Sequence, residues 1–370
     1  MSGPSDGGGE GARLSRRTLL TGAGVGAAGL AFGSDTASAS PQRKDRNHRT
    51  RVVLAGTAGG PPPQAGRLGI CTVIVVEDRA YIVDLGPSGV TAYANAGLTM
   101  EQIRSVFVTH LHSDHIAELY NLFWLNYGAQ GARGKITGPV DIYGPGRADK
   151  PPQAPGAKVQ NPDDPTPGLT DFLTSSVAGT AYDLNTRMTE SRTPDIWEIL
   201  KPHDIALAGI DAGAANRVPA MEPIQIMDDG FVKVTAILVD HPPVFPSFAF
   251  RFDTADGSVV VSGDTAPCDN LIRLARGADV LVHEVYDHDY FTAINPRLAE
   301  TFSRTHTASH VVGGVAAAAG VTTLVLNHLV PAGISDVRDS VWKRNARRGF
   351  SDEVIVGRDG DEIGVGRRRR

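Results

Sequence analysis

The chain has 370 residues, of which 41% are hydrophobic and 21% are charged. This is ordinary globular usage, and the chain is long enough to bury a substantial core. The net charge is −5, and setting aside the four positive charges of Arg367–Arg370 leaves −9 for residues 1–366. An acidic body without a long basic stripe argues against a large polyanionic partner such as structured RNA, so we expect no nucleic-acid partner.

The N-terminus has the pattern of an export signal. Arg16 and Arg17 precede a small apolar stretch, and ASA follows at residues 37–39. Paired arginines before such a stretch are typical of the twin-arginine signal. We predict a signal peptide over residues 1–39, membrane contact only during export, and a periplasmic, cell-surface or extracellular destination. An uncleaved anchor is the alternative.

The chain contains two cysteines, Cys71 and Cys268. Twin-arginine substrates cross the membrane folded, so we expect this chain to fold in the reducing cytoplasm. Cys71 lies in the apolar run ICTVIVV and is interpreted as a buried free thiol. A bridge between the two cysteines is the alternative, because the destination is oxidising.

The first part of the mature chain predicts strands joined by Gly- and Pro-rich turns. The strands are expected in RVVLAGTAGG, GICTVIVVEDRAYIVDLG and IRSVFVTH. The segment HIAELYNLFWLNYG has apolar residues near a 3.6-residue period and predicts a helix. From residue 128 to 218 the pattern loosens into loops around a helix expected at 169–188. We interpret this stretch as an insertion.

Regularity returns after residue 218. Strands are expected in VKVTAILVDH, SFAFRFDTADGSVVVSGDT, ADVLVHEVY and TTLVLNH, with a helix through ASHVVGGVAAAAG. Strands and helices therefore alternate in both halves of an α/β fold. The strongly apolar strands end in polar residues, which are His110, His241, Asp264, Glu284 and His328. Strand ends carry sites in such folds, because the sheet fixes the backbone while loops present the side chains.

The segment THLHSDH places three histidines and an aspartate within seven positions. His110 and His112 lie two apart in a loop and can direct both imidazoles at one metal ion. Asp114 and His115 can face a second ion. Zinc favours imidazole nitrogen and carboxylate oxygen. Two ions about 3.5–4 Å apart can activate a nucleophile and neutralise an oxyanion together.

Further ligands are needed to complete two metal shells. His241, Asp264 and His328 are the candidates, because each ends an apolar strand. His203 in LKPHDI is a rival to His241, but no clear strand leads into it. The run GTAGG lacks the lysine and the following helix of a phosphate-binding loop, so we interpret it as a tight turn.

The four-residue motif in THLHSDH resembles that of the metallo-β-lactamase superfamily. The chain looks most like the branch of RNase Z-like tRNA-maturation nucleases, arylsulfatases and phosphodiesterases. LAGTAGGPPP resembles its opening turn and IVDLG its early aspartate motif, and SGDT, VHEVY, HTASH and LVLNHL follow in order. The resemblance covers most of residues 51–330. It implies a four-layered αβ/βα sandwich in a catalytic domain over residues 40–370, with the insertion at about 128–218.

The resemblance also implies a set of metal ligands for two zinc ions, with manganese or iron as alternatives. One ion would be held by His110, His112 and His241, the other by Asp114, His115 and His328, and Asp264 would bridge them. Asp84 would accept a hydrogen bond from a ligand or order the ligand loop. Its alternative role is that of a strand-end turn residue.

Two catalytic residues are implied as well. Asp114 would hold the proton or the orientation of the nucleophile. His306 matches the histidine that this branch uses near the scissile group, where it could donate a proton to the leaving oxygen. Glu284 is a candidate to orient it, and a capping or buried histidine is the alternative for His306. The remaining candidates are interpreted as structural: His203, His283, His288 and His310.

One departure from the branch concerns RNA. Its tRNA-maturing members carry a long arm between the third histidine and the bridging aspartate, whereas 22 residues separate His241 from Asp264 here. The 125 residues between His115 and His241 are instead well placed to form a lid or substrate wall.

We therefore expect an exported hydrolase that attacks small ester-like substrates with a metal-bound hydroxide. Phosphodiesters and aryl sulfates rank first, with lactones and carboxylic esters next. An RNase Z-like RNA-processing endonuclease is the first alternative. A mono-iron redox protein or a non-catalytic metal-binding module is the second.

Overall fold

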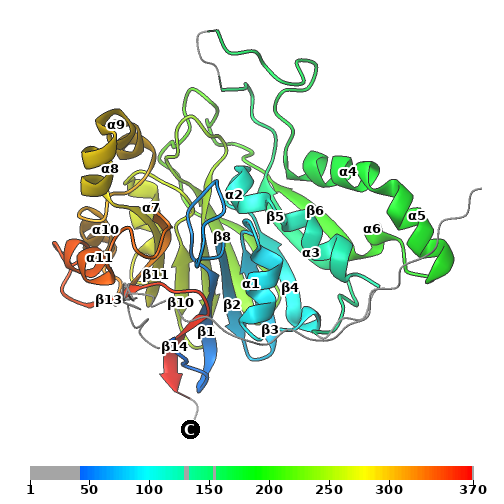
Figure 1. The fold of residues 1–370 in the computed structure, drawn as a ribbon, viewed down its shortest axis with the longest axis horizontal. Coiled ribbons are helices and arrows are strands. Elements are labelled where there is room, and N and C mark those ends of the chain that lie inside the picture. Colours follow the sequence, from blue (N-terminus) through cyan, green and yellow to red (C-terminus); the bar gives the residue numbers. More distant parts are fainter. Residues whose placement is uncertain (1–41, 129–132, 153–155, 369–370) are drawn as a thin grey trace, which may run out of the picture. The chain divides into compact units, whose positions relative to one another are not determined.

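The computed structural model describes residues 42–128, 133–152 and 156–368, and within these ranges the strands form two seven-stranded sheets (Figure 1). The predicted signal peptide, residues 1–39, lies outside the described residues. Among the helices of the described ranges, none is both long and apolar enough to cross a membrane.

The first sheet has the strand order β14-β1-β2-β3-β4-β5-β6. Strands β3 to β6 run parallel to one another, while β14, β1, β2 and β3 form antiparallel pairs. The bounds are β1 His48–Gly56, β2 Cys71–Val76, β3 Arg79–Val83, β4 Ile103–Phe107, β5 Val140–Pro145, β6 Leu200–Ile205 and β14 Asp361–Arg368.

The second sheet has the strand order β13-β12-β11-β10-β9-β8-β7. Strands β10 to β13 are parallel, and β7 to β10 form antiparallel pairs. The bounds are β7 Ile224–Asp228, β8 Val232–Leu238, β9 Phe248–Thr254, β10 Ser258–Val261, β11 Val280–Tyr286, β12 Thr323–Val330 and β13 Glu353–Val356.

Helices cover the outer faces of both sheets (Figure 1). Helices α1, α3 and α4 pack on the first sheet, and α7, α10 and α11 pack on the second. This is the αβ/βα sandwich predicted from the sequence. The helices are α1 Gly89–Asn95, α2 Ser113–Ile116, α3 Leu119–Asn126, α4 Leu169–Gly179, α5 Ala181–Glu190, α6 Ile196–Ile199, α7 Asp269–Ala275, α8 His288–Ile294, α9 Pro296–Thr305, α10 Val312–Ala319 and α11 Asp339–Ala346, with a 3₁₀ turn at Met100–Gln102.

The layers follow from the two-residue period of the strands. In β1, Val52 and Leu54 belong to the core between the sheets, whereas Val53 belongs to the core beneath the outer helices. Phe107 at the end of β4 meets Phe250 and Phe252 of β9, with ring centroids 5.6 and 5.1 Å apart. These aromatic contacts join the two sheets three residues before His110.

The stretch predicted as an insertion, residues 128–218, is an insertion only in part. It contains β5 and β6, which extend the first sheet because β5 pairs in parallel with β4 and β6 with β5. Long proline-rich loops separate these two short strands, so the sequence shows no sustained strand pattern there. The excursions between the strands, including α4 and α5, are the additional material.

Both helices predicted in the first half are broken in the structure. The helix expected at 169–188 is divided into α4 and α5 beside Gly179 and Thr180, two residues of low helix propensity. The helix expected after the histidine motif is divided into α2 and α3. There the amide of Glu118 donates to the carbonyl of Leu85 at 2.9 Å, outside the helix. Tertiary pairing therefore overrides the apolar periodicity.

Both cysteines are free, and Cys71 is buried as predicted. Burial raises the pKa of the Cys71 thiol. Cys71 belongs to the core beneath the helices of the first sheet, while Cys268, directly before α7, packs against the separate core cluster of the second sheet. The alternative of a bridge between the two cysteines is therefore wrong for this structure.

The contacts of Phe250 generate a stability prediction. Phe250 is fully buried between the sheets, so Phe250→Ala should lower the free energy of unfolding by about 3–5 kcal/mol through lost burial and cavity formation. Urea unfolding of the purified chain measures this change. Phe231→Ala is the matched control, because its side chain is 37% exposed. Equal losses in the two variants would contradict the assigned packing.

Candidate metal centre

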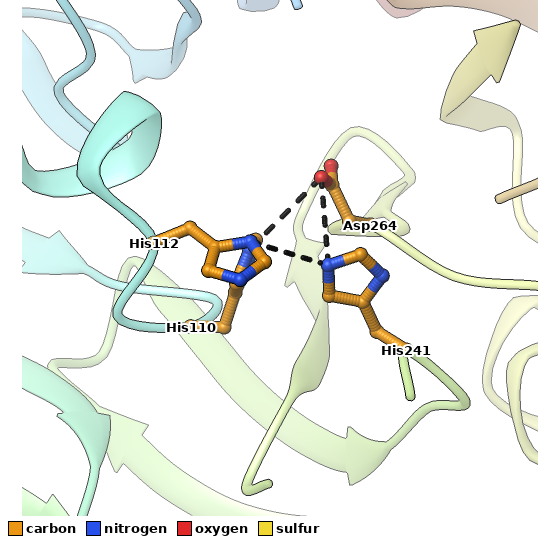
Figure 2. A group of neighbouring side chains, drawn as sticks. All are labelled: His110, His112, His241 and Asp264. Atoms are coloured by element: carbon orange, nitrogen blue, oxygen red, sulfur yellow. Dashed lines mark hydrogen bonds and ion pairs between the residues drawn. The ribbon is translucent and has the colours of Figure 1, made fainter. Parts of the chain in front are cut away.

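The seven predicted ligands converge in two groups at the strand ends. The first group is His110, His112, His241 and Asp264, and the second is Asp114, His115, Asp264 and His328. Within each group, one ligand atom of every residue lies within 4.8 Å of the others. Figure 2 shows the side chains of the first group pointing toward one another. Asp264 belongs to both groups, which is the position that a bridging ligand requires.

Both oxygens of the Asp264 carboxylate lie near imidazoles of the ligand groups. Its Oδ1 lies 3.4 Å from Nε2 of His328. Its Oδ2 lies 3.4 Å from Nε2 of His115 and 4.0 Å from Nε2 of both His110 and His241. One carboxylate thus faces imidazoles of both groups.

The donor atoms of the site fit divalent metal ions. His110 Nε2, His115 Nε2 and Asp264 Oδ1 are buried and have no hydrogen-bond partner. Buried polar atoms ordinarily have a hydrogen-bond partner, so three ligand atoms that lack one and are directed at one place require an explanation. Imidazole nitrogen and carboxylate oxygen are the ligands that zinc prefers. These seven residues are therefore suited to hold two such ions.

The electrostatics of the first group favour metal binding. Burial lowers the pKa of His110 and His112 and lowers that of His241 to about 4, so these imidazoles are neutral. Neutral imidazole is the form that coordinates a metal. Burial alone would raise the pKa of Asp264, but the neighbouring His328 and His115 bring it well below its usual value. Asp264 is therefore ionised.

Asp84, at the end of β3, holds the ligand loop in place through hydrogen bonds. Its carboxylate accepts hydrogen bonds from the amide and the hydroxyl of Thr109, both at 2.8 Å, and lies 2.7 Å from Nδ1 of His115. The last contact leaves Nε2 of His115 directed at the metal group. The hydrogen bond predicted between Asp84 and a ligand is confirmed.

Two residues of the site adopt left-handed backbone conformations, with φ of 59° at Asp84 and 44° at His328. Such conformations cost about 1–3 kcal/mol in residues other than glycine and cluster at functional sites. They turn the chain sharply where β3 ends and within the last residues of β12. Nothing in the sequence pattern indicates them.

Sequence reasoning also missed the role of Gly59 and Gly60 in the GTAGG turn. The amide of Gly60 donates to Oδ2 of Asp114 at 3.0 Å. A Cβ atom on Gly60 would lie 2.3 Å from Cβ of Asp114, and one on Gly59 would lie 2.8 Å from the imidazole of His328. Only glycine lets the backbone approach two ligands this closely. The paired glycines three and four residues after β1 were the available signal.

His306 lies beside the first group, with its ring centroid 4.9 Å from that of His241. Its Nδ1 is 3.2 Å from Oε1 of Glu284, which also accepts hydrogen bonds from the amides of Thr265 and Thr307. Burial alone would lower the pKa of His306, but the Glu284 carboxylate raises it to about 9. Glu284 therefore orients His306, as predicted, and keeps it protonated at neutral pH.

Comparison with known proteins agrees with this geometry. Residues 66–123 match the family model of the metallo-β-lactamase superfamily. The chain is 30% identical over 322 residues to ribonuclease Z of Mycobacterium bovis (strain BCG / Pasteur 1173P2), a match that covers 86% of this chain and 99% of the relative. The chain belongs to the metallo-β-lactamase superfamily. It is a metal-dependent hydrolase.

Solved structures of the superfamily share the fold. Human tRNase Z, short form, is 20% identical with a TM-score of 0.55, and the match covers 85% of this chain and 99% of that one. The metallo-β-lactamase-fold protein YhfI of Bacillus subtilis is 19% identical with a TM-score of 0.53, covering 85% and 98%. At these identities the likeness concerns the fold alone.

The other histidines lie outside the two groups of this metallo-β-lactamase-fold hydrolase. His203, the rival of His241, is on β6 and pairs with Asp141 at 2.7 Å. His283 is buried, with Nδ1 2.6 Å from the carbonyl of Glu284. The rings of His288 and His310 lie 5.7 Å apart. These contacts agree with structural roles.

The shared position of Asp264 in the metallo-β-lactamase site generates a prediction. Asp264→Ala removes the carboxylate that faces both groups, so bound zinc should fall well below two ions per chain and activity should be lost. Inductively coupled plasma mass spectrometry measures the metal. Asp253→Ala removes a partly exposed carboxylate on β9 that pairs with Arg251, and should retain both properties. Two zinc ions in Asp264→Ala would refute the bridging role.

Proposed function

We propose that this chain hydrolyses phosphodiesters at a centre of two zinc ions held by the seven residues. The observation that carries the proposal is the sharing of Asp264 between two complete ligand groups. Two-metal sites are common in phosphatases and nucleases. The relative named ribonuclease Z, matched over nearly its whole length, supports a phosphodiester as the bond that is cleaved.

The residues of the chain have separate tasks in this reaction. When bound, the two ions would activate water and neutralise negative charge on the phosphate. Asp114, fixed by the Gly60 amide, would hold the proton or the orientation of the attacking water. His306, protonated and held by Glu284, would donate a proton to the leaving oxygen.

The comparisons favour RNA processing over the wider range of esters expected from the sequence. They give no support to aryl sulfates, lactones or carboxylic esters, nor to the expectation that nucleic acid is not a partner. Within phosphodiester hydrolysis, an RNase Z-like endonuclease is the second and narrower candidate, and the match to ribonuclease Z supports it. Against it, the segment between His241 and Asp264 is built around the β9–β10 hairpin and offers no long arm.

A substrate panel tests the proposed function. Zinc-loaded protein should hydrolyse bis(p-nitrophenyl) phosphate, while p-nitrophenyl sulfate, p-nitrophenyl acetate and a lactone should react at least about a hundredfold more slowly. The zinc-poor Asp264→Ala variant controls for contaminating enzymes. A clear preference for the sulfate, acetate or lactone would overturn phosphodiester hydrolysis.

Precursor tRNA separates the two phosphodiester candidates. The RNA-processing candidate predicts accurate 3′ trimming at a rate comparable to small-substrate turnover, with steep salt dependence from phosphate contacts. A precursor that stays intact at micromolar concentration, under conditions where bis(p-nitrophenyl) phosphate is hydrolysed, would remove that candidate. Small phosphodiesters would then be the substrates.

The position of His306 generates a kinetic prediction. His306→Ala should lower turnover by about 10²–10⁴-fold if the side chain acts as a general acid, with zinc content unchanged. A phosphodiester with a p-nitrophenolate leaving group should lose less activity than one with an alkoxide leaving group, because the better leaving group needs less protonation. Equal losses on both substrates would contradict the acid role.

A further inference from the structure

A cavity of about 380 Å³ opens beside the first ligand group. This volume is within the range of small-molecule sites, about 300–1,000 Å³. Its walls are mainly apolar. They include five prolines, Pro145, Pro152, Pro165, Pro167 and Pro246, and five larger side chains, Leu111, Ile116, Phe172, Val244 and Phe245.

The cavity adjoins the metal ligands through the chain itself. His112 is part of the lining. Leu111 stands between His110 and His112, and Ile116 follows His115. Val244 lies three residues after His241, and its amide donates to the His241 carbonyl at 2.8 Å. A group bound in this cavity is therefore next to the first metal group.

Another part of the wall comes from the end of β5 and the excursion between β5 and β6. Phe172 on α4 lines the cavity together with the segments around Ala148 and Thr166. The Thr166 hydroxyl donates to the Ala148 carbonyl at 2.9 Å, which ties these two segments together. Arg147, the neighbouring cation, pairs with Asp164 and Asp171. Hydrogen bonds and ion pairs within this excursion therefore stabilise the wall.

The lining offers little to a charged or strongly polar group. Among the described residues that line the cavity, His112 is the only one with an ionisable side chain. The hydroxyl of Thr166 is already donated to the backbone. Two phenylalanines and several prolines are surfaces on which a flat ring packs, and burial of such a ring is favourable without hydrogen bonds.

We propose that this cavity binds a flat, uncharged aromatic ring attached to the phosphate of the substrate. The inference rests on the proposed phosphodiester hydrolysis and adds the chemistry of the neighbouring group. Either an aryl group or a nucleobase has this chemistry. Apart from His112 and Thr166, the side chains of the described lining residues are apolar, so recognition of the ring is by shape and stacking.

Calorimetric binding to the zinc-loaded full chain tests the ring preference without requiring turnover. Phenylphosphonate should bind about tenfold or more tightly than methylphosphonate, because only the former buries a ring. Uridine 5′-monophosphate compared with ribose 5-phosphate tests the nucleobase. A gain with phenyl alone identifies an aryl subsite, and a gain with uridine identifies a base subsite. No gain in either pair overturns the proposal.

Two variants locate the effect in the cavity. Phe172→Ala removes a wall and Ala148→Phe fills the space, so each should reduce phenylphosphonate affinity by about tenfold while leaving methylphosphonate within about twofold. Phe231→Ala, at the turn between β7 and β8, is the matched control and should change neither affinity. Unchanged phenylphosphonate affinity in both cavity variants would place the ring elsewhere and refute the proposal.

The two proposals fail in different ways. A chain that hydrolyses no phosphodiester but binds phenylphosphonate through Phe172 would contradict the proposed function and leave the ring site standing. A chain that hydrolyses phosphodiesters but binds phenyl- and methylphosphonate equally would do the reverse.

Discussion

The carboxylate of Asp264 is the constraint around which the site is organised. It is buried, and it faces the imidazoles of both ligand groups as well as that of His306. Removing a carboxylate from water is costly unless positive charge or hydrogen bonds compensate it. Two divalent ions would supply that charge beside ligand atoms that have no hydrogen-bond partner. The fold therefore has to position four separate segments of chain around this one side chain.

Several contacts hold these segments in place. The Phe107 cluster joins the sheets just before the histidine motif, and Asp84 holds the motif from below. The backbone of the Gly59–Gly60 turn packs closely against Asp114 and His328. Glu284 contacts the imidazole of His306 and accepts a hydrogen bond from the amide of Thr265, the residue directly after Asp264. Ligands from distant parts of the sequence are thus positioned by backbone contacts as well as by strands.

The ligand set could be predicted from the sequence because its signal is local. Each strand-end candidate, such as His241 or Asp264, lies in the last residues of an apolar strand or within three residues of its end, and strand ends meet at one edge of an α/β sheet. The hairpin between β9 and β10 was equally visible in its alternating pattern. Asp84 and the Glu284–His306 pair could be predicted only through the resemblance to the superfamily.

Other features depend on tertiary contacts that no local pattern encodes. The helix break at Glu118 arises from pairing with Leu85. β5 is a strand because β4 offers it a parallel edge, and β6 is one because β5 does the same. The left-handed backbone at His328 and the approach of Gly60 to Asp114 are set by the packing of the finished site. The sequence indicated a lid or substrate wall between His115 and His241, and Phe172 of that stretch does line the apolar cavity. The cavity itself could not be predicted, since its walls come from segments as distant as Leu111, Phe172 and Phe245.

Anomalous diffraction at the zinc absorption edge, from crystals of the zinc-loaded chain, tests the central claim most directly. We predict two zinc peaks per chain about 3.5–4 Å apart, one at each ligand group, with the carboxylate of Asp264 between them. A single peak, or peaks away from these residues, would contradict the account.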